Sequence, residues 1–247
     1  MRGPTAGAAL TAMERLPVLA FEEIGTKGIT ILAPHPDDES LGCGGLIRAA
    51  RDRDVPVTIV ILSDGTGSHP GSSSYPAERL RALREAEALA AAGVLGVPSN
   101  DVHFLRLPDR FVPSYGPAAE EAVAQLADHI RLSGSDFVAV TWEEDPHCDH
   151  KAAASLARAA CILTSTRLFA YPIWGRTLPP DADVKALPGN GFRLDIRNEL
   201  AAKRKAIAAH RSQTTDLITD DPNGFTLTPA LLSLFETSCE VYLEMQL

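Results

Sequence analysis

Two short runs of mostly β-branched apolar residues, GITILA at 28–33 and PVTIVILS at 56–63, lack any alternation of apolar and polar positions. Strands with one solvent-exposed face alternate, whereas strands buried on both faces of a parallel sheet do not. Both runs therefore predict buried parallel strands. Residues 41–50 between them supply apolar side chains for the helix that a parallel connection requires.

The same succession of strand and helix patterns continues along the chain. Residues 77–92 have apolar side chains at helical spacing and predict a helix that stops at Gly93, because glycine readily adopts the left-handed conformation of a helix end. A helical stripe within 119–130, a strand pattern at 136–142 and a helical stripe within 153–160 follow. The chain thus predicts an α/β fold with a doubly wound, mostly parallel sheet and helices on both faces. Ligands bind such sheets at the carboxyl ends of the strands.

The composition bounds the size and the partners of the protein. With 45% hydrophobic and 22% charged residues, 247 positions can bury a sizeable core, and we expect a single domain over residues 1–247. The net charge of -9 disfavours nucleic acid as a partner, because nucleic-acid binders carry basic patches. We therefore expect a small-molecule partner.

The chain ends and the cysteines give weaker indications. Residues 1–24 lack the continuous apolar stretch of a signal peptide or membrane span, so we expect a loosely ordered lead-in and no membrane partner. Residues 214–247 should extend the same domain, with the apolar stretch 225–247 either covering the sheet or mediating self-association as a homo-oligomer. The four cysteines are scattered without a CxxC pair, which favours a reducing, cytoplasmic location.

Acidic and histidine residues gather directly after two of the predicted strands. PHPDDES at 34–40 follows the first strand, 28–33. EEDPHCDHKAA at 143–153 follows the predicted strand 136–142. Both clusters should therefore lie on the same edge of the sheet. His35, Asp38 and His150 then supply two imidazoles and one carboxylate, a set that suits a catalytic zinc ion with an open position for water.

The remaining members of the two clusters can take the other roles of a hydrolytic site. Asp37 is a candidate general base, Asp149 can orient a histidine ligand, and His147 can stabilise or protonate the reacting group. Simpler interpretations exist for each cluster. A helix start alone favours acidic residues, Asp149 can be a helix cap and His147 a solvated loop residue, but none of these explains His35.

PHPDDE after the first strand and the downstream HCDH resemble the motifs of the LmbE-like, or PIG-L, family of zinc-dependent N-acetylglucosaminyl deacetylases, over roughly residues 28–213. The resemblance implies a Rossmann-like fold. It also implies a hydrolase that removes the acetyl group from an N-acetylglucosamine-type amino sugar conjugate, with release of acetate and a free amine. An amide hydrolase of the same fold that acts on a non-sugar or antibiotic-linked N-acyl substrate is the alternative.

The resemblance also assigns roles to residues of this chain. It implies one zinc ion per chain, held by His35, Asp38 and His150. Asp37 corresponds to the general base, and a protonated His147 to the group that stabilises the oxyanion and protonates the leaving amine.

Further positions match the family less specifically. The arginine and glutamate on the second helix correspond to Arg84 and Glu87, and the aspartate after the third strand to Asp109 in RLPDR. The resemblance places Arg84 and Asp109 near the sugar, although Arg84 and Glu87 at this spacing would also fit a surface ion pair. HRSQ at 210–213 resembles a late motif of the family. Cys148 stands where many members have proline, a departure that bears on local rigidity and substrate preference more than on the metal ligands.

Other functions fit the sequence less well. A set of two histidines and a carboxylate also serves non-haem iron oxygenases, but we find no route for electrons. The GCGG segment at 42–45 lacks the third glycine of a dinucleotide-binding loop. A sugar-binding protein without activity would not need the base, and a serine hydrolase would need a GxSxG elbow that the chain lacks.

Two loop segments are candidates for setting the substrate. Residues 63–79 are rich in glycine, serine and proline and predict a mobile loop beside the site, with 171–191 as its partner. Trp174 and Tyr171 could stack on a sugar ring, and packing in the core is the alternative for both.

Overall fold

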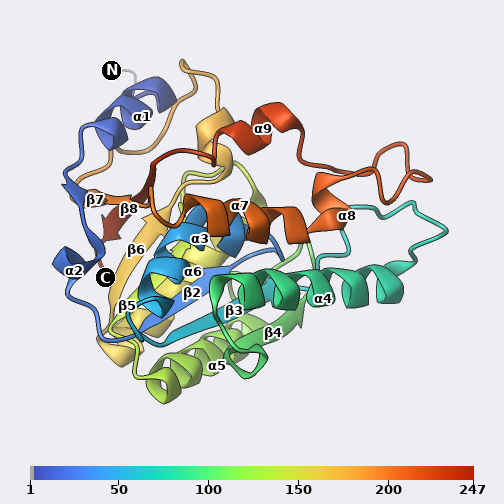
Figure 1. The fold of residues 1–247 in the computed structure, drawn as a ribbon, viewed down its shortest axis with the longest axis horizontal. Helices are drawn as coiled ribbons and strands as arrows, with labels where there is room; N and C mark the ends of the chain where they lie inside the picture. Colours follow the sequence, from blue (N-terminus) through green and yellow to red (C-terminus); the bar gives the residue numbers. More distant parts are fainter. Residues whose placement is uncertain (1–2) are drawn as a thin grey trace.

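A computed structural model describes residues 3–247, which form one eight-stranded sheet with helices on both sides (Figure 1). The strands are β1 (Val18–Leu19), β2 (Ile29–Ala33), β3 (Val57–Ser63), β4 (Val102–Leu107), β5 (Phe137–Thr141), β6 (Arg167–Tyr171), β7 (Gly191–Asp195) and β8 (Cys239–Met245). Their order is β1-β7-β8-β6-β5-β2-β3-β4, and β8 pairs antiparallel with both of its neighbours while the other pairs are parallel. The predicted mostly parallel, doubly wound α/β sheet is confirmed.

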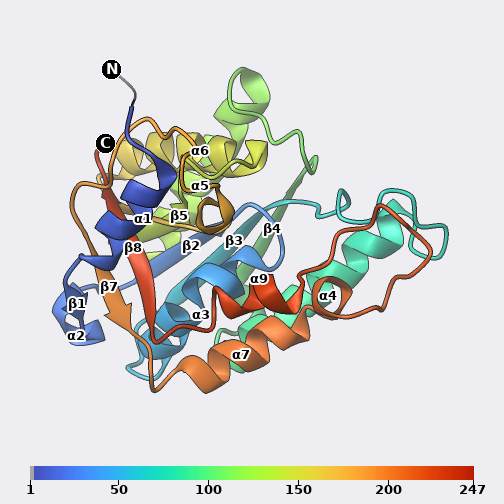
Figure 2. The same cartoon turned by 90° about the horizontal axis from the view of Figure 1, so that it is seen from above.

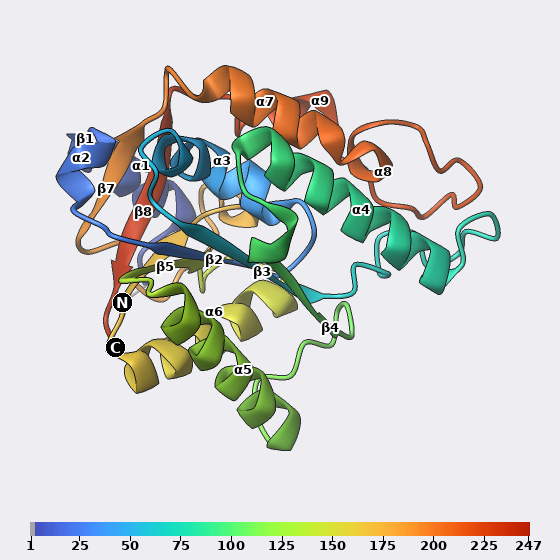
Figure 3. The ribbon, with the colours of Figure 1, turned by 60° about the horizontal axis from the view of Figure 1, so that its bottom comes forward.

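The helices bury two hydrophobic clusters, one on each face of the sheet. They are α1 (Ala6–Glu14), α2 (Phe21–Ile24), α3 (Asp38–Arg51), α4 (Ala77–Leu95), α5 (Pro117–Ser133), α6 (Cys148–Thr164), α7 (Leu200–Ala209), α8 (Arg211–Thr214) and α9 (Pro229–Ser233), with short 3-10 turns η1 (Ser99–Asp101) and η2 (Trp174–Thr177). Figure 3 shows α3, α4 and α7 on one side of the sheet and α5 and α6 on the other. Strand β2 serves both clusters, because Ile31 belongs to one and Leu32 to the other. No helix within residues 3–247 is long and apolar enough to cross a membrane.

The order of the strands changes direction at β2, and a ligand site is expected at this place. From β2 the chain passes to β3 and β4 on one side, and then returns to β5 on the other side of β2. The strand order thus reverses next to the carboxyl end of β2. Open α/β sheets bind their ligands in the crevice at such a reversal.

The glycines of GCGG lie inside α3 and serve close packing. A Cβ on Gly42 would collide with the ring of Tyr171, and one on Gly45 would collide with the side chain of Ile196. Glycine at these positions lets α3 lie against its neighbours without displacing them. These contacts account for the glycines without a dinucleotide.

A buried ion pair holds the middle of α3. The Glu240 carboxylate accepts hydrogen bonds from the backbone N–H groups of Gly45 at 2.7 Å and Leu46 at 2.8 Å, and it pairs with Lys203 Nζ at 2.7 Å. Glu240 lies on β8 and Lys203 on α7. Strand β8 and helix α7 therefore fix the helix whose N-terminus begins the candidate site.

The end of α4 differs from the sequence prediction. The helix continues through Gly93 to Leu95 and ends at Gly96, which has a φ of 88° in the left-handed region. The N–H of Gly96 is satisfied by the carbonyls of Ala92 and Gly93. Gly93 stays helical because a helical glycine costs only about 1 kcal/mol relative to alanine, which packing can offset.

Both chain ends differ from the sequence prediction. The expected loose lead-in of residues 1–24 is wrong for its described part, because α1 buries Ala6, Ala9 and Met13 and β1 pairs with β7. The apolar stretch 225–247 was expected to cover the sheet or to self-associate. Its strand β8 instead lies inside the sheet, between β7 and β6. Most of its side chains are buried there, because a hydrophobic cluster covers each face of the sheet.

Candidate active site

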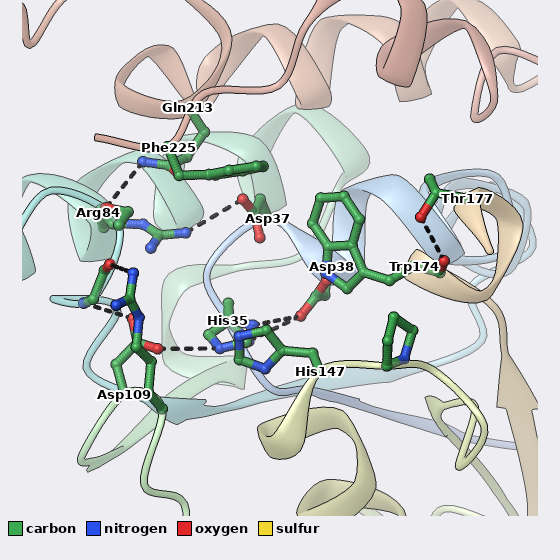
Figure 4. Close-up of a pocket in the computed structure, with 14 residues that line it drawn as sticks. His35, Asp37, Asp38, Arg84, Asp109, His147, Trp174, Thr177, Gln213 and Phe225 are labelled. Atoms are coloured by element: carbon green, nitrogen blue, oxygen red, sulfur yellow. Dashed lines mark hydrogen bonds and ion pairs between the residues drawn. The ribbon is translucent and has the colours of Figure 1, made fainter. Parts of the chain in front are cut away.

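The two charged clusters meet at the carboxyl ends of β2 and β5. His35 lies in the loop after β2, and Asp38 begins α3. His147 is the N-cap residue of α6, and His150 lies in the first turn of that helix. Figure 4 shows His35, Asp38 and His147 around one pocket. The parallel pairing of β2 with β5 is what brings residues more than a hundred positions apart into contact.

Asp38 joins the two histidines that the sequence predicts as metal ligands. Its Oδ2 atom lies 3.2 Å from Nδ1 of His35 and 3.3 Å from Nε2 of His150. Burial opposes ionisation of Asp38, but the positive charge of nearby His150 and the hydrogen-bonded contact with His35 outweigh it and hold the pKa of this carboxyl far below its usual range. Asp38 is therefore a carboxylate directed at both imidazoles.

Further carboxylates hold the outer nitrogens of the same histidines. His35 Nε2 lies 3.1 Å from Asp149 Oδ2 and 3.3 Å from Asp109 Oδ1, and His150 Nδ1 lies 2.9 Å from Asp145 Oδ2. Such contacts fix the orientation of an imidazole that binds a metal through its other nitrogen.

The carboxylates also make the cluster favour positive charge. Burial lowers the pKa of His150, but Asp38 and Asp145 outweigh it and raise the pKa to about 9. Burial is likewise the largest effect on His35, and its hydrogen bonds to Asp109, Asp149 and Asp38 raise its pKa well above the usual value. A site that holds protons this strongly can hold a divalent cation in their place.

The residues fit a divalent metal ion. Among the described residues, His150 Nε2 is a fully buried ring nitrogen without a hydrogen-bond partner, although Asp38 lies close to it. Buried polar nitrogens rarely lack a hydrogen-bond partner, and coordination to a metal ion would supply the missing partner of His150 Nε2. Donor atoms of His35, His147 and His150 also lie within 4.8 Å of one another, so the geometry offers a three-histidine set as well.

Asp37 lies beside this cluster and is held by Arg84. Arg84 Nη2 lies 3.3 Å from Asp37 Oδ2, and the same guanidinium donates to the carbonyls of Gly65 at 2.8 Å and Pro36 at 3.0 Å. Burial raises the pKa of Asp37 to about 6, and the charge of Arg84 limits the rise. Such a pKa lets a carboxylate accept a proton near neutral pH.

The surface ion pair considered for Arg84 and Glu87 is wrong. Arg84 is 3% exposed and Glu87 7% exposed, and the structure assigns them different partners. Glu87 accepts hydrogen bonds from the backbone N–H of Ser212 at 2.8 Å and from its hydroxyl at 2.6 Å. Glu87 thus anchors the HRSQ segment to α4, whereas Arg84 faces the pocket.

Sequence reasoning missed the pair of Glu39 and His210. Glu39 Oε2 accepts the backbone N–H of Asp37 at 3.0 Å, and Oε1 lies 2.9 Å from Nε2 of His210. Both side chains are fully buried. The pair fixes the backbone of Asp37 while Arg84 orients its carboxylate. Glu39 stands in the first cluster, but its partner lies 171 positions further along the chain.

His147 differs from the expected protonated form. Burial, together with the charges of His35 and His150, lowers the pKa of His147 to about 4, so its imidazole is neutral at pH 7. Its Nδ1 atom accepts the backbone N–H of Asp149 at 3.2 Å. The ring proton is then on Nε2, where a neutral imidazole can still donate a hydrogen bond.

Asp149 anchors a neighbouring loop besides contacting His35. Its carboxylate accepts the backbone N–H groups of Arg110 at 2.6 Å and Val112 at 3.1 Å. The adjacent Cys148 is exposed and does not line the pocket. The departure at Cys148 therefore leaves the predicted metal ligands in place.

The pocket above these groups has a volume of about 490 Å³, within the usual range for small-molecule sites. It is lined by His35, Asp37, Asp38, Gly67, Ser68, Arg84, Asp109, Arg110, Pro146, His147, Trp174, Thr177, Gln213 and Phe225. Tyr171 is absent from the lining, because it is buried in the core with its hydroxyl donating to the carbonyl of Leu32 at 2.9 Å. Of the two aromatic candidates, Trp174 alone reaches the pocket.

The role of Asp145 can be tested by an isosteric change. Asp145 was not predicted, although it stands five residues before His150 in the second cluster. We expect Asp145→Asn to weaken metal binding by about 10- to 100-fold, because a neutral amide polarises His150 less than a carboxylate does. Competition with a chromophoric chelator measures this affinity. Glu143→Gln, on the same loop but paired with Arg158 at 3.1 Å instead of with a histidine, is the matched control; equal affinities in both variants would remove Asp145 from the metal site.

Known proteins are similar to this chain in sequence and in fold. The sequence profile of the PIG-L family, described as GlcNAc-PI de-N-acetylase, matches residues 30–161. A probable N-acetyl-alpha-D-glucosaminyl L-malate deacetylase 2 of Bacillus subtilis is 28% identical over 200 residues, covering 77% of this chain and 85% of the relative. The N,N'-diacetylchitobiose deacetylase of Pyrococcus horikoshii superposes with a TM-score of 0.63 at 25% identity, over 89% of this chain and 84% of that one.

The fold alone does not identify the reaction. The 4-carboxy-2-hydroxymuconate hydratase GalB of Pseudomonas putida superposes with a TM-score of 0.61 at 22% identity, over 74% of this chain and 78% of that one. Sequence and fold together define the class: a hydrolase that cleaves an amide bond and is built on a mostly parallel, three-layer α/β sheet. The chain belongs to the PIG-L family of de-N-acetylases.

Proposed function

We propose that this chain is a metal-dependent N-deacetylase that removes the acetyl group from an N-acetylglucosamine-type sugar conjugate and releases acetate and a free amine. One observation carries the proposal: a buried set of metal-binding groups, His35, Asp38 and His150, stands beside a carboxylate with a pKa of about 6, Asp37. Membership of the PIG-L family supports the same reaction. We further propose that residues 1–247 work as one domain.

We propose zinc as the metal, one ion per chain, held by His35, Asp38 and His150. Two imidazoles and a carboxylate are a common donor set for catalytic zinc. Zinc so bound activates water and polarises a carbonyl group. The outer contacts of Asp145 with His150 and of Asp149 with His35 suit this role, because they orient each ring.

The side chains around the metal-binding set account for the proton transfers. Asp37 accepts a proton from the attacking water, and Arg84 keeps its carboxylate directed into the pocket. With a pKa of about 6, Asp37 can release that proton again to the leaving nitrogen. His147 donates from Nε2 to the developing oxyanion as a neutral imidazole, in place of the protonated form that the sequence predicted.

The proposed substrate is an amino sugar conjugate, and two charged side chains of the pocket wall are candidates to contact it. Asp109 accepts the backbone N–H of Gly67 at 2.7 Å and contacts His35, so it positions the pocket wall. We propose that Asp109 and Arg84 lie close to the bound sugar. The cysteines are free, which supports the proposed cytoplasmic location.

Acetate release tests this function directly. The zinc-loaded protein should release acetate from acetamido sugars such as N-acetylglucosamine conjugates, and it should do so equally well without oxygen. Release from none of them, with hydrolysis of N-acetyl amino acids instead, would favour the non-sugar alternative. A requirement for iron and oxygen would favour an oxygenase.

A further inference from the structure

Two aromatic side chains line the pocket together with the proposed catalytic groups. The rings of Trp174 and Phe225 meet edge to face, with centroids 5.5 Å apart and an angle of 83° between their planes. Figure 4 shows both rings lining the same pocket as Asp37 and Asp38. Phe225 is 36% exposed, so this apolar ring stays partly open to whatever enters the pocket.

The aromatic pair lies outside the part of the chain that matches the family profile. That match covers residues 30–161, which contain the proposed metal ligands and the base. Trp174 and Phe225 come from later segments. A shared catalytic centre with walls from other segments is the usual arrangement when loops set substrate choice.

Trp174 is fixed relative to the metal-binding set. Its backbone N–H donates to Asp145 Oδ2 at 3.2 Å, and that of Gly175 donates to Asp145 Oδ1 at 2.6 Å. Asp145 also contacts His150 at 2.9 Å. One buried carboxylate thus orients a proposed metal ligand and sets the position of the Trp174 wall.

Phe225 is fixed by a second set of contacts between two surface loops. Its backbone N–H donates to the carbonyl of Ser68 at 2.8 Å. Asp220 accepts the Ser72 hydroxyl at 2.7 Å, and Asp221 accepts the backbone N–H of Gly71 at 2.8 Å. Figures 1 and 2 show the two loops side by side beyond α4. The glycine-rich loop that was predicted to be mobile is therefore tied to the loop that carries Phe225.

We propose that Trp174 and Phe225 form an aromatic subsite that selects substrates whose acetamido sugar is joined to a second pyranose ring. This proposal rests on the proposed deacetylase function. A pyranose presents a face of C–H groups that packs well against an aromatic ring, whose face carries partial negative charge. A short carboxylate substituent would bring negative charge to that face and leave the apolar surface uncovered. The pair therefore favours a disaccharide over an acid conjugate.

A comparison of substrates tests the subsite. The ratio of kcat/KM for N,N'-diacetylchitobiose to that for N-acetylglucosamine should exceed one in the wild type. This ratio should fall about tenfold in Phe225→Ala and in Trp174→Ala, because a ring contact contributes a free energy that corresponds to about a tenfold change. Trp174→Phe keeps an aromatic ring and should retain most of the ratio. Tyr115→Ala, an aromatic residue 87% exposed and outside the pocket lining, is the matched control and should leave the ratio unchanged.

Binding measured without turnover separates this proposal from the function on which it rests. Titration with N,N'-diacetylchitobiose, followed by tryptophan fluorescence, should show binding that weakens about tenfold in Phe225→Ala but not in Tyr115→Ala. Such binding without acetate release would leave the subsite standing and overturn the deacetylase function. Acetate release with the same substrate ratio in all variants, or a wild-type preference for N-acetylglucosaminyl malate over the disaccharide, would overturn the subsite.

Discussion

Asp37→Ala is expected to lower kcat for acetate release by about 10²- to 10⁴-fold while the protein keeps its metal, because this range is what a general base contributes. Asp37 is the carboxylate with a pKa of about 6 next to the metal-binding set, and Arg84 and Glu39 hold its side chain and backbone. The alanine removes the proton acceptor and leaves His35 and Asp38 in place.

Three measurements on purified Asp37→Ala check this expectation. Metal content should stay at the wild-type level, KM should change much less than kcat, and the circular dichroism spectrum should be unchanged. Asp128→Ala, which removes an exposed carboxylate on α5, is the matched control and should keep full activity. Normal turnover in Asp37→Ala would show that another group takes the proton.

Asp38→Ala should lose the metal itself, and with it essentially all activity. The Oδ2 atom of Asp38 lies close to both inward-facing nitrogens, 3.2 Å from Nδ1 of His35 and 3.3 Å from Nε2 of His150. Without it, two imidazoles remain and the cation loses a neutralising charge, so binding weakens by orders of magnitude.

The ligand set can be resolved by comparing Asp38→Ala with His147→Ala. If His35, Asp38 and His150 hold the metal, His147→Ala should keep the metal and lose turnover, because His147 then only contacts the reacting carbonyl. If the three histidines hold it, His147→Ala should lose the metal and Asp38→Ala should retain it. Metal analysis of both variants after gel filtration gives the answer.

The parts of the fold that the sequence predicted best are those determined by local patterns. Strands β2, β3 and β5 are buried on both faces, so each reads as an unbroken apolar run. The rule that ligands bind at the carboxyl ends of such strands was enough to place His35 and His150 together. These predictions needed no knowledge of distant contacts.

The features that were missed depend on contacts between distant segments. Residues 6–14 form a helix whose small apolar side chains are buried only because they pack against the rest of the fold. The sequence of β8 resembles an apolar tail, and its place in the sheet depends on pairing with β7 and β6. Glu39 gains its role from His210, which no spacing rule connects to it. Phe225 likewise reaches the pocket through bonds between two loops that are far apart in the chain.

The neutral form of His147 also could not be predicted from the sequence. Its pKa depends on burial and on the charges of His35 and His150, both of which are known only once the loops after β2 and β5 are placed. A motif names the residue but not the electrostatic field around it.

The acidic cluster after β2 is expected to bind a metal ion with which the protein hydrolyses the acetamido group of an N-acetyl sugar. The most direct test of this expectation is metal content by mass spectrometry on the purified protein, measured beside acetate release from N-acetylglucosamine conjugates with and without chelator. We predict about one zinc ion per chain, and acetate release that a chelator abolishes and added zinc restores. A protein that binds no divalent metal when supplied with it, or that releases acetate equally well with chelator present, would contradict this expectation.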